Sequence, residues 1–188
     1  AYNLVKNLKE TIEIPVHMQT HATTGMSAAT NMKEIEAGID NIDTSISSLS
    51  MTYGHSATET MLAIFEDQDR EIILDLEALE EVSKFFRNIR KKYSEFEGGL
   101  KGVDSSMLVK QVPGGMLSNL ESQLRANKQE DKIDLVKDEI PKVRKDFGYP
   151  PLVTPASQIV GAQALLNVMS SNRYENLSNE SINLITGK

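Results

Sequence analysis

The sequence predicts an α/β segment followed by a mostly α-helical region. Over the first third of the chain, helical spacing of apolar residues alternates with the every-second-residue spacing of strands, which is typical of parallel strands joined by helical crossovers. From about residue 70 onward only helical spacing remains. The chain has 188 residues, of which 39% are hydrophobic, and this fits a globular protein with one medium domain or two small ones.

The first third contains five predicted elements. They are a helix at 2–10, a strand at 14–20, a helix at 26–37, a strand at 39–47 and a helix at 56–65. In the first strand Val16, Met18 and Thr20 share one side, because successive side chains of a strand point to opposite faces. Gly38 follows the second helix, in a position where glycine commonly ends helices. Two strands are too few for a stable parallel sheet, which needs further neighbours.

In the remainder of the chain, the spacing of apolar residues predicts five further helices. They cover 75–93, 112–128, 130–148, 154–169 and about 179–186. The first carries an apolar stripe made of Leu76, Leu79, Val82, Phe86, Ile89 and Tyr93. Pro141 predicts a kink, and the small apolar residues of 154–169 predict the most deeply buried helix. The composition changes at 66–70, which is the one domain boundary that the sequence indicates.

Charge and composition exclude several classes of protein. The formal net charge of −7 argues against a nucleic-acid-binding surface, which needs a basic stripe. The absence of cysteine excludes disulfides, cysteine-based zinc sites and a cysteine nucleophile. No apolar run is long enough to span a bilayer, and the N-terminus lacks a signal-peptide pattern. Because Ala1 opens the chain in place of a methionine, we expect a processed product or a piece of a longer chain.

The segment PVHMQTHATTGM, residues 15–26, suggests a metal site. His17 and His21 would share one face of a helix, but Pro15 and the alternating pattern favour a strand, where residues four apart lie about 13 Å from each other and cannot bind one ion. Ligands on a strand are two residues apart, which points to Gln19 and His21. Spacing alone favours the simpler interpretation that both histidines are hydrogen-bonded interior residues, since one histidine and one glutamine are a weak metal signal and the neutral oxygen of Gln19 is a weaker ligand than imidazole.

Other polar residues have plain structural interpretations. His55 is predicted to be a loop histidine before a helix, with Ser56 as the N-cap. Thr154 precedes Pro155, and this pair fits an N-cap threonine followed by proline at the first helical position. Asp43 could orient a metal ligand from behind, or could be a buried side chain bonded to the backbone.

Five longer motifs point to one family. In chain order they are THATTGM, IDTSISSLSMTYGHSATET, FRNIRKKYSEFEG, VPGGMLSNLESQLRA and PLVTPASQIVGAQALLNVM. Together they closely resemble the carboxyltransferase component of biotin-dependent enzymes. This group includes the oxaloacetate decarboxylase alpha chain, the carboxyltransferase subunit of two-subunit pyruvate carboxylases and the pyruvate-side subunit of transcarboxylase. The resemblance covers nearly the whole chain.

The resemblance implies a (β/α)8 TIM barrel followed by a helical domain that forms a funnel over the barrel mouth. It assigns residues 1–68 to the end of the barrel, with its last two strands, and residues 69–188 to a helical conserved carboxylase domain. It also implies an upstream part that carries a metal-binding aspartate, a carboxylated lysine, and the arginine and glutamine that hold the keto acid. The isolated fragment is therefore expected to be inactive.

The resemblance also implies a chemistry and its residues. A carboxyl group moves between oxaloacetate or pyruvate and biotin through enolpyruvate, assisted by a divalent metal such as Zn²⁺. The family's pair of metal-binding histidines falls on Gln19 and His21, so this sequence departs from the family at Gln19. The proton-shuttling threonine falls on Thr154, and the neighbouring Ser157 and Gln158 are expected to line the biotin pocket.

Expected partners are a biotin-carrier domain or subunit, the keto-acid substrate, further copies of the chain and membrane decarboxylase subunits. The expected location is cytoplasmic, with peripheral membrane attachment through partner subunits. Oxaloacetate decarboxylation, pyruvate carboxylation and transcarboxylation remain open. A non-catalytic assembly module that docks a carrier or a decarboxylase subunit is the alternative of a different class. An aldolase- or lyase-type metal reaction is a third option, against which the VTPASQ segment argues.

Overall fold

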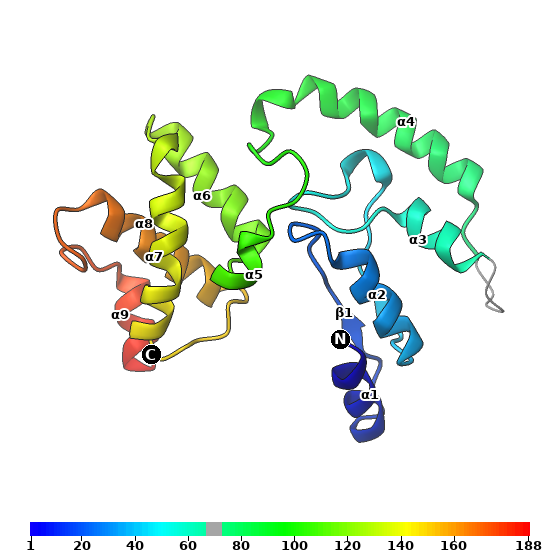
Figure 1. Cartoon of the computed structure of the whole chain (residues 1–188), viewed down its shortest axis with the longest axis horizontal. Helices are drawn as coiled ribbons and strands as arrows, with labels where there is room; N and C mark the ends of the chain where they lie inside the picture. The colour runs from blue at the N-terminus through cyan, green and yellow to red at the C-terminus, as the bar shows by residue number, and fades with distance from the viewer. Residues whose placement is uncertain (67–72) are drawn as a thin grey trace. The chain divides into compact units, whose positions relative to one another are not determined.

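The computed structural model describes residues 1–66 and 73–188, which form two compact units, 1–105 and 106–188 (Figure 1). The first unit combines helices with a small parallel sheet, and the second is helical. The predicted fold class, α/β followed by mostly α, is confirmed. The predicted domain boundary between residues 68 and 69 lies outside the described residues and stays a prediction.

The first unit contains a two-stranded sheet and the helices around it. Its elements are α1 (Tyr2–Thr11), β1 (His17–Met18), α2 (Ser27–Glu36), β2 (Asn41–Ile42), η1 (Ser47–Leu49), α3 (Thr58–Phe65), α4 (Leu76–Lys92) and η2 (Ser94–Phe96). The two strands are parallel, with His17 opposite Asn41. A second parallel bridge joins Ser45 to Ala57, just before α3. The helix α2 supplies the crossover between the strands, as the alternating pattern predicted.

Both strands are shorter than the predicted ranges 14–20 and 39–47. Pro15 has no N–H group for a ladder, and the N–H of Val16 donates to the carboxylate of Asp40 at 2.6 Å instead of to a strand. The ladder therefore begins only at β1, and beyond β2 the chain leaves its partner. Alternating hydrophobicity marks a half-buried extended segment, but the length of a strand is set by the partner beside it.

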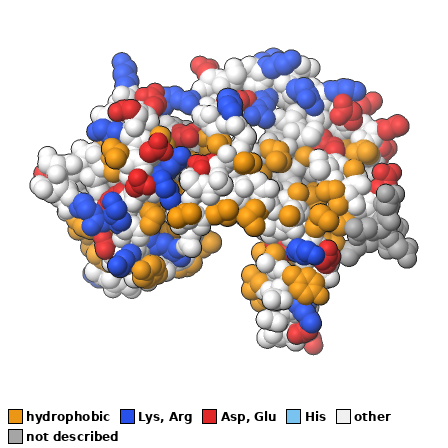
Figure 2. Space-filling view, in the orientation of Figure 1, with side chains coloured by type: hydrophobic (Ala, Val, Ile, Leu, Met, Phe, Trp, Pro, Cys, Tyr) orange, Lys and Arg blue, Asp and Glu red, His pale blue; other side chains and the backbone are white. Residues whose placement is uncertain are grey.

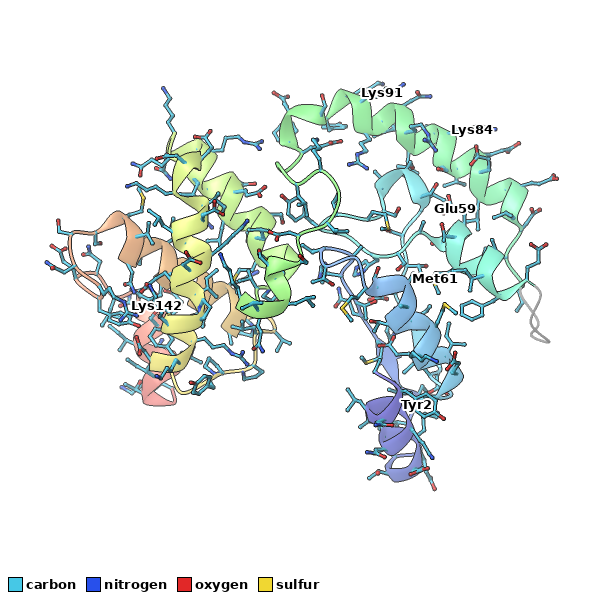
Figure 3. The ribbon with its side chains drawn as sticks, viewed as in Figure 1. Tyr2, Glu59, Met61, Lys84, Lys91 and Lys142 are labelled. Atoms are coloured by element: carbon cyan, nitrogen blue, oxygen red, sulfur yellow. The ribbon has the colours of Figure 1, made fainter. Side chains whose placement is uncertain are left out.

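Half of the apolar stripe predicted for α4 is exposed. Val82 and Tyr93 are 44% and 59% exposed, whereas the buried position of the helix is Ser83. The hydroxyl of Ser83 lies 2.7 Å from that of Ser47, where α4 packs against η1. Lys84 projects outward from the same helix, and charged side chains cover this part of the unit (Figures 2 and 3). Leu76 is also exposed, whereas Leu79, Phe86 and Ile89 are partly buried, so half of the predicted stripe is exposed within this unit.

The second unit is built around one central helix. Its elements are α5 (Ser106–Lys110), α6 (Gly114–Ala126), η3 (Glu130–Lys132), α7 (Ile133–Asp146), α8 (Ala156–Met169) and α9 (Asn179–Thr186). The helix α8 packs against α6, α7 and α9, which confirms that it is the most deeply placed. Gly161 allows close packing, because a Cβ atom there would lie 3.0 Å from Cγ of Met116. Among the residues described, no helix has both the length and the apolar character needed to cross a membrane.

A buried carboxylate fastens the loop after α8 to α7. Glu139 is 5% exposed and accepts hydrogen bonds from Arg173 at 2.6 Å, Asn167 at 3.0 Å and Lys142 at 3.2 Å. Burial opposes ionisation, but these donors together outweigh it and hold the pKa of Glu139 below its ordinary value. Arg173 also donates to Asp146 at 2.8 Å, so that one guanidinium joins two carboxylates of α7. The network adds to the stacking of Phe147 on Tyr174 at this edge of the unit.

We expect Arg173→Ala to lower the free energy of unfolding by about 2 kcal/mol, because it leaves a buried carboxylate without its shortest charged donor. Lys142, whose side chain projects from α7 (Figure 3) and is 60% exposed, is the matched control. Lys142→Ala should cost less than about 1 kcal/mol. Urea denaturation at pH 7 measures both. Equal losses for the two variants would contradict a dominant role of Arg173.

The same carboxylate predicts an acid-sensitive stability. Because the folded-state pKa of Glu139 is lowered from the ordinary value of 4.5, its stabilising effect is complete above that pH and is lost as the pH falls through the lowered pKa. Glu139→Gln should therefore be less stable than the wild type at pH 7, while its stability should fall less steeply below pH 4.5. Urea titrations at several pH values test this. If the free energy of unfolding depends on pH in the same way in both proteins, another group causes the loss of stability at low pH.

Candidate functional site

Two histidines from distant parts of the sequence lie side by side in the first unit. His21 follows β1 and His55 precedes α3, and their ring centroids are 5.0 Å apart with planes inclined by 35°. Nδ1 of His21 lies 2.5 Å from the backbone oxygen of Tyr53, and Nδ1 of His55 lies 2.8 Å from the backbone oxygen of Thr20. Each ring is thus held by the loop that carries the other.

Further hydrogen bonds join these two loops. The N–H of Ala22 donates to the backbone oxygen of Gly54 at 2.7 Å, and the hydroxyl of Ser56 donates to that of Ser27, also at 2.7 Å. Ala22, Ser56 and Ser27 are all buried. The prediction that Ser56 is the N-cap of α3 is wrong, because Ala57 occupies that position. The hydroxyl of Ser56 is instead used in the interior, where an unpaired polar group would be costly.

The hydrogen bonds determine which nitrogen of each histidine is available. A backbone oxygen can only accept, so Nδ1 of His21 and of His55 must carry the proton. In the neutral rings, Nε2 then has a free lone pair. Histidines that bind metals commonly donate their other N–H to a backbone oxygen in this way. His21 therefore fits the predicted role of metal ligand, and His55 presents the same chemistry.

The residues described here supply only part of a metal-binding set. Within 1–66 and 73–188, no group of three or more histidine, aspartate or glutamate side chains could hold an ion. Gln19 lies beyond the end of β1, is exposed, and makes no side-chain hydrogen bond to a described residue. The prediction that Gln19 and His21 lie on one strand is wrong, because β1 ends at Met18. The ligand roles of both residues stay predictions.

His17 is engaged in a different interaction. Its Nε2 atom lies 2.7 Å from Oδ1 of Asp43, across the two-stranded sheet. Its side chain is 56% exposed and that of Asp43 is 37% exposed. Of the two roles considered for Asp43, neither is found: the carboxylate pairs with His17, not with His21 or with a backbone group. His17 is thus separate from the His21–His55 pair, as the spacing argument required.

The site predicted in the second unit lies at the start of α8. Pro155 occupies the N-cap position and no side chain caps the helix, so Thr154 is not the N-cap that the sequence predicted. Thr154 is exposed, and its hydroxyl forms no hydrogen bond with a described residue. Ser157 is buried and its N–H donates to the backbone oxygen of Val153 at 2.9 Å, whereas Gln158 is exposed. The roles of these residues toward biotin stay predictions.

His55 lies in a loop, as its sequence predicts, but the sequence does not indicate that it lies against His21. Nothing in the local sequence around His55 signals this pairing, because the two rings meet only after the loops that follow β1 and precede α3 have packed together. The one signal available was that the chain has three histidines, two of which flank loops at strand or helix ends.

Comparison with known proteins gives a consistent result. Residues 107–188 match the family model described as a conserved carboxylase domain. The chain is 46% identical over 188 residues to a pyruvate carboxylase subunit of Methanocaldococcus jannaschii, covering all of this chain and 33% of that protein. It is 44% identical over 189 residues to the methylmalonyl-CoA carboxyltransferase 5S subunit of Propionibacterium freudenreichii, covering all of this chain and 37% of that protein. The chain therefore spans about a third of the length of these relatives.

Solved structures are similar over the same region. The carboxyl transferase domain of Rhizobium etli pyruvate carboxylase with pyruvate and biocytin is 28% identical, with a TM-score of 0.88. The similarity covers 97% of this chain and 32% of that chain. Helices with a small parallel sheet thus match the C-terminal part of that domain.

The geometry at α8 predicts that Thr154→Ala changes the free energy of unfolding by less than about 0.5 kcal/mol, because no capping bond is lost. Ser178 offers a matched comparison in the same unit. Its hydroxyl caps α9 by accepting from the N–H of Ser181 at 3.0 Å, so Ser178→Ala should cost about 1 kcal/mol. Thermal unfolding of the two variants checks this, and a large loss for Thr154→Ala would restore the capping role.

Proposed function

The chain resembles the C-terminal part of the carboxyltransferase domain of biotin-dependent enzymes, and we propose that it forms part of an enzyme that moves a carboxyl group between a keto acid and biotin. The observation that carries the proposal is similarity over the whole chain both to a pyruvate carboxylase subunit and to a carboxyltransferase subunit. The similarity to a solved domain that holds pyruvate and biocytin supports the same pairing of reactants.

The proposed substrate is the pair oxaloacetate and pyruvate. The pyruvate carboxylases among the relatives support this choice. A 2-oxoglutarate carboxylase large subunit of Hydrogenobacter thermophilus is 38% identical over 190 residues and points to a larger keto acid as the alternative substrate. In either direction the keto acid passes through its enolate, here enolpyruvate. Carboxyl transfer from oxaloacetate to biotin is the decarboxylase direction, and transfer to pyruvate is the carboxylase direction.

Thr154 is proposed to move a proton during the transfer. Its exposed hydroxyl has no hydrogen-bond partner among the described residues, so it can accept a proton on one side while it donates its own on the other. Its backbone position is fixed by the start of α8. Gln158, exposed in the first turn of α8, is proposed to contact biotin, and the buried Ser157 to shape the floor of the same pocket.

A divalent metal such as Zn²⁺ would, when bound, polarise the keto group of the substrate and stabilise the enolate. His21 is proposed as a ligand through Nε2, with the backbone oxygen of Tyr53 orienting the ring from behind. Gln19 is proposed as a weaker ligand through its amide oxygen. Because the described residues hold no cluster of three acidic or histidine ligands, the 188-residue chain is expected to have no turnover by itself.

Assembly with partners is proposed alongside catalysis. A biotin carrier, further copies of the chain and membrane decarboxylase subunits are the candidate partners. The observation that favours a docking role is the exposure of large apolar side chains in the first unit, among them Phe85 at 60% and Phe96 at 72%. Docking without catalysis is the second candidate function, and loss of transfer in the Thr154 variants below would argue against it.

The test is carbon-isotope exchange between labelled pyruvate and oxaloacetate in the assembled enzyme with its biotin carrier. Thr154→Ala should slow the exchange about 100-fold, because the proton relay is removed, whereas Thr154→Ser should stay within about tenfold of the wild type. Ser178→Ala, which removes a helix cap of the same unit, is the control for stability and should exchange at the wild-type rate. Full activity in both Thr154 variants would end the proton-transfer proposal.

A further inference from the structure

We propose that His55 joins His21 to form a two-imidazole site for a divalent transition metal such as Zn²⁺, so that His55 supplies the nitrogen ligand that Gln19 does not offer. This inference rests on the proposed role of His21 as a metal ligand. It adds a residue that neither the sequence pattern nor the family's histidine pair indicates, because His55 comes from a different loop.

The first support is the availability of both nitrogens. His21 and His55 each use Nδ1 to donate to a backbone oxygen, which leaves Nε2 of each neutral ring free to bind a metal. The two outer bonds are reciprocal, since each ring is oriented by the loop of its neighbour. A backbone oxygen behind Nδ1 also fixes the ring and raises the basicity of Nε2, which is the usual arrangement around metal-bound histidines.

The second support is the distance between the rings. Two imidazoles that bind one tetrahedral metal at about 2.0–2.1 Å have their ring centres about 5 Å apart. The centroids of His21 and His55 are 5.0 Å apart, and their planes are tilted by 35° and not stacked in parallel. The ring centres are therefore at a separation that a shared metal allows, and both side chains are half-buried, so little conformational freedom remains to be lost on binding.

The third support is the chemistry of Gln19. An amide oxygen is a neutral, harder donor than imidazole and binds borderline divalent metals less strongly. Gln19 is exposed and lies past the end of β1, without a side-chain hydrogen bond to a described residue that would orient it. A site with one imidazole and one free amide would bind weakly. A second imidazole, held by Thr20 and by the bond from Ala22 to Gly54, restores two nitrogen ligands.

The test measures metal binding by the 188-residue chain, independently of catalysis. Zn²⁺ affinity is determined by calorimetry for the wild type, His21→Asn and His55→Asn. Asparagine keeps an amide N–H near the place of Nδ1, which preserves the bond to the backbone oxygen, but removes Nε2. Each substitution should weaken Zn²⁺ binding at least about tenfold. Circular dichroism confirms that the variants are folded.

His17→Gln is the matched control for the third histidine of the chain. Glutamine keeps a donor for the carboxylate of Asp43, and Zn²⁺ binding should stay unchanged because His17 lies outside the proposed site. As a second measurement, Cu²⁺ is added and the nitrogen splitting of its electron paramagnetic resonance spectrum counts the imidazoles bound. The wild type should show two imidazole nitrogens and His55→Asn one.

The outcomes separate this inference from the proposed function. Loss of binding in His21→Asn but not in His55→Asn would overturn the role of His55 while leaving His21 as a ligand. Unchanged binding in both variants would overturn both assignments. Gln19→His completes the test, because it should reduce the loss caused by His55→Asn when the two are combined. Failure of Gln19→His to do so in a folded protein would contradict the claim that His55 takes the place of that ligand.

Discussion

The reciprocal hydrogen bonds between the loop after β1 and the loop before α3 are the constraint on which the first unit depends. His21 donates to Tyr53 and His55 donates to Thr20, so two imidazoles and two backbone oxygens close a ring of contacts. With only a short two-stranded sheet among the described residues of the unit, these bonds and the one from Ala22 to Gly54 connect the segments that the strands do not. The bonds that hold the loops together are therefore also the bonds that select Nε2 as the free nitrogen of each ring.

In the second unit, the residues that stabilise the fold differ from the residue that is predicted to transfer a proton. Its polar interior is organised around Glu139, whose charge is held by Arg173, Asn167 and Lys142 at one end of the central helix α8. Thr154 lies at the other end of that helix and takes part in no such network. A hydroxyl that caps no helix is free to exchange its proton, and the helix start that positions it is maintained by contacts elsewhere.

In the second unit the helices α6, α7, α8 and α9 could be predicted closely because local spacing is enough to define them, whereas the five-residue helix α5 was not predicted. The pattern of 154–169 placed α8 within a few residues, and its small residues correctly indicated close packing around Gly161. The stripe of α4 was equally regular, yet half of it is exposed in the first unit, since periodicity identifies an apolar face but not the surface that covers it. Thr154 shows the same limit on a smaller scale: the dipeptide with Pro155 fits a capped helix start, and the observed N-cap is the proline.

By itself the sequence determined the order of the strands and of the longer helices, the change to an all-helical region, and the motifs that resemble a carboxyltransferase domain. These depend on residues that are close together in the chain, or on the identity of whole motifs. Tertiary structure alone decided where the strands end, which carboxylate His17 meets and that His55 lies against His21. The reason is physical: these features arise from hydrogen bonds and contacts between segments distant in sequence. Such contacts do not produce a periodic spacing of residues in either segment.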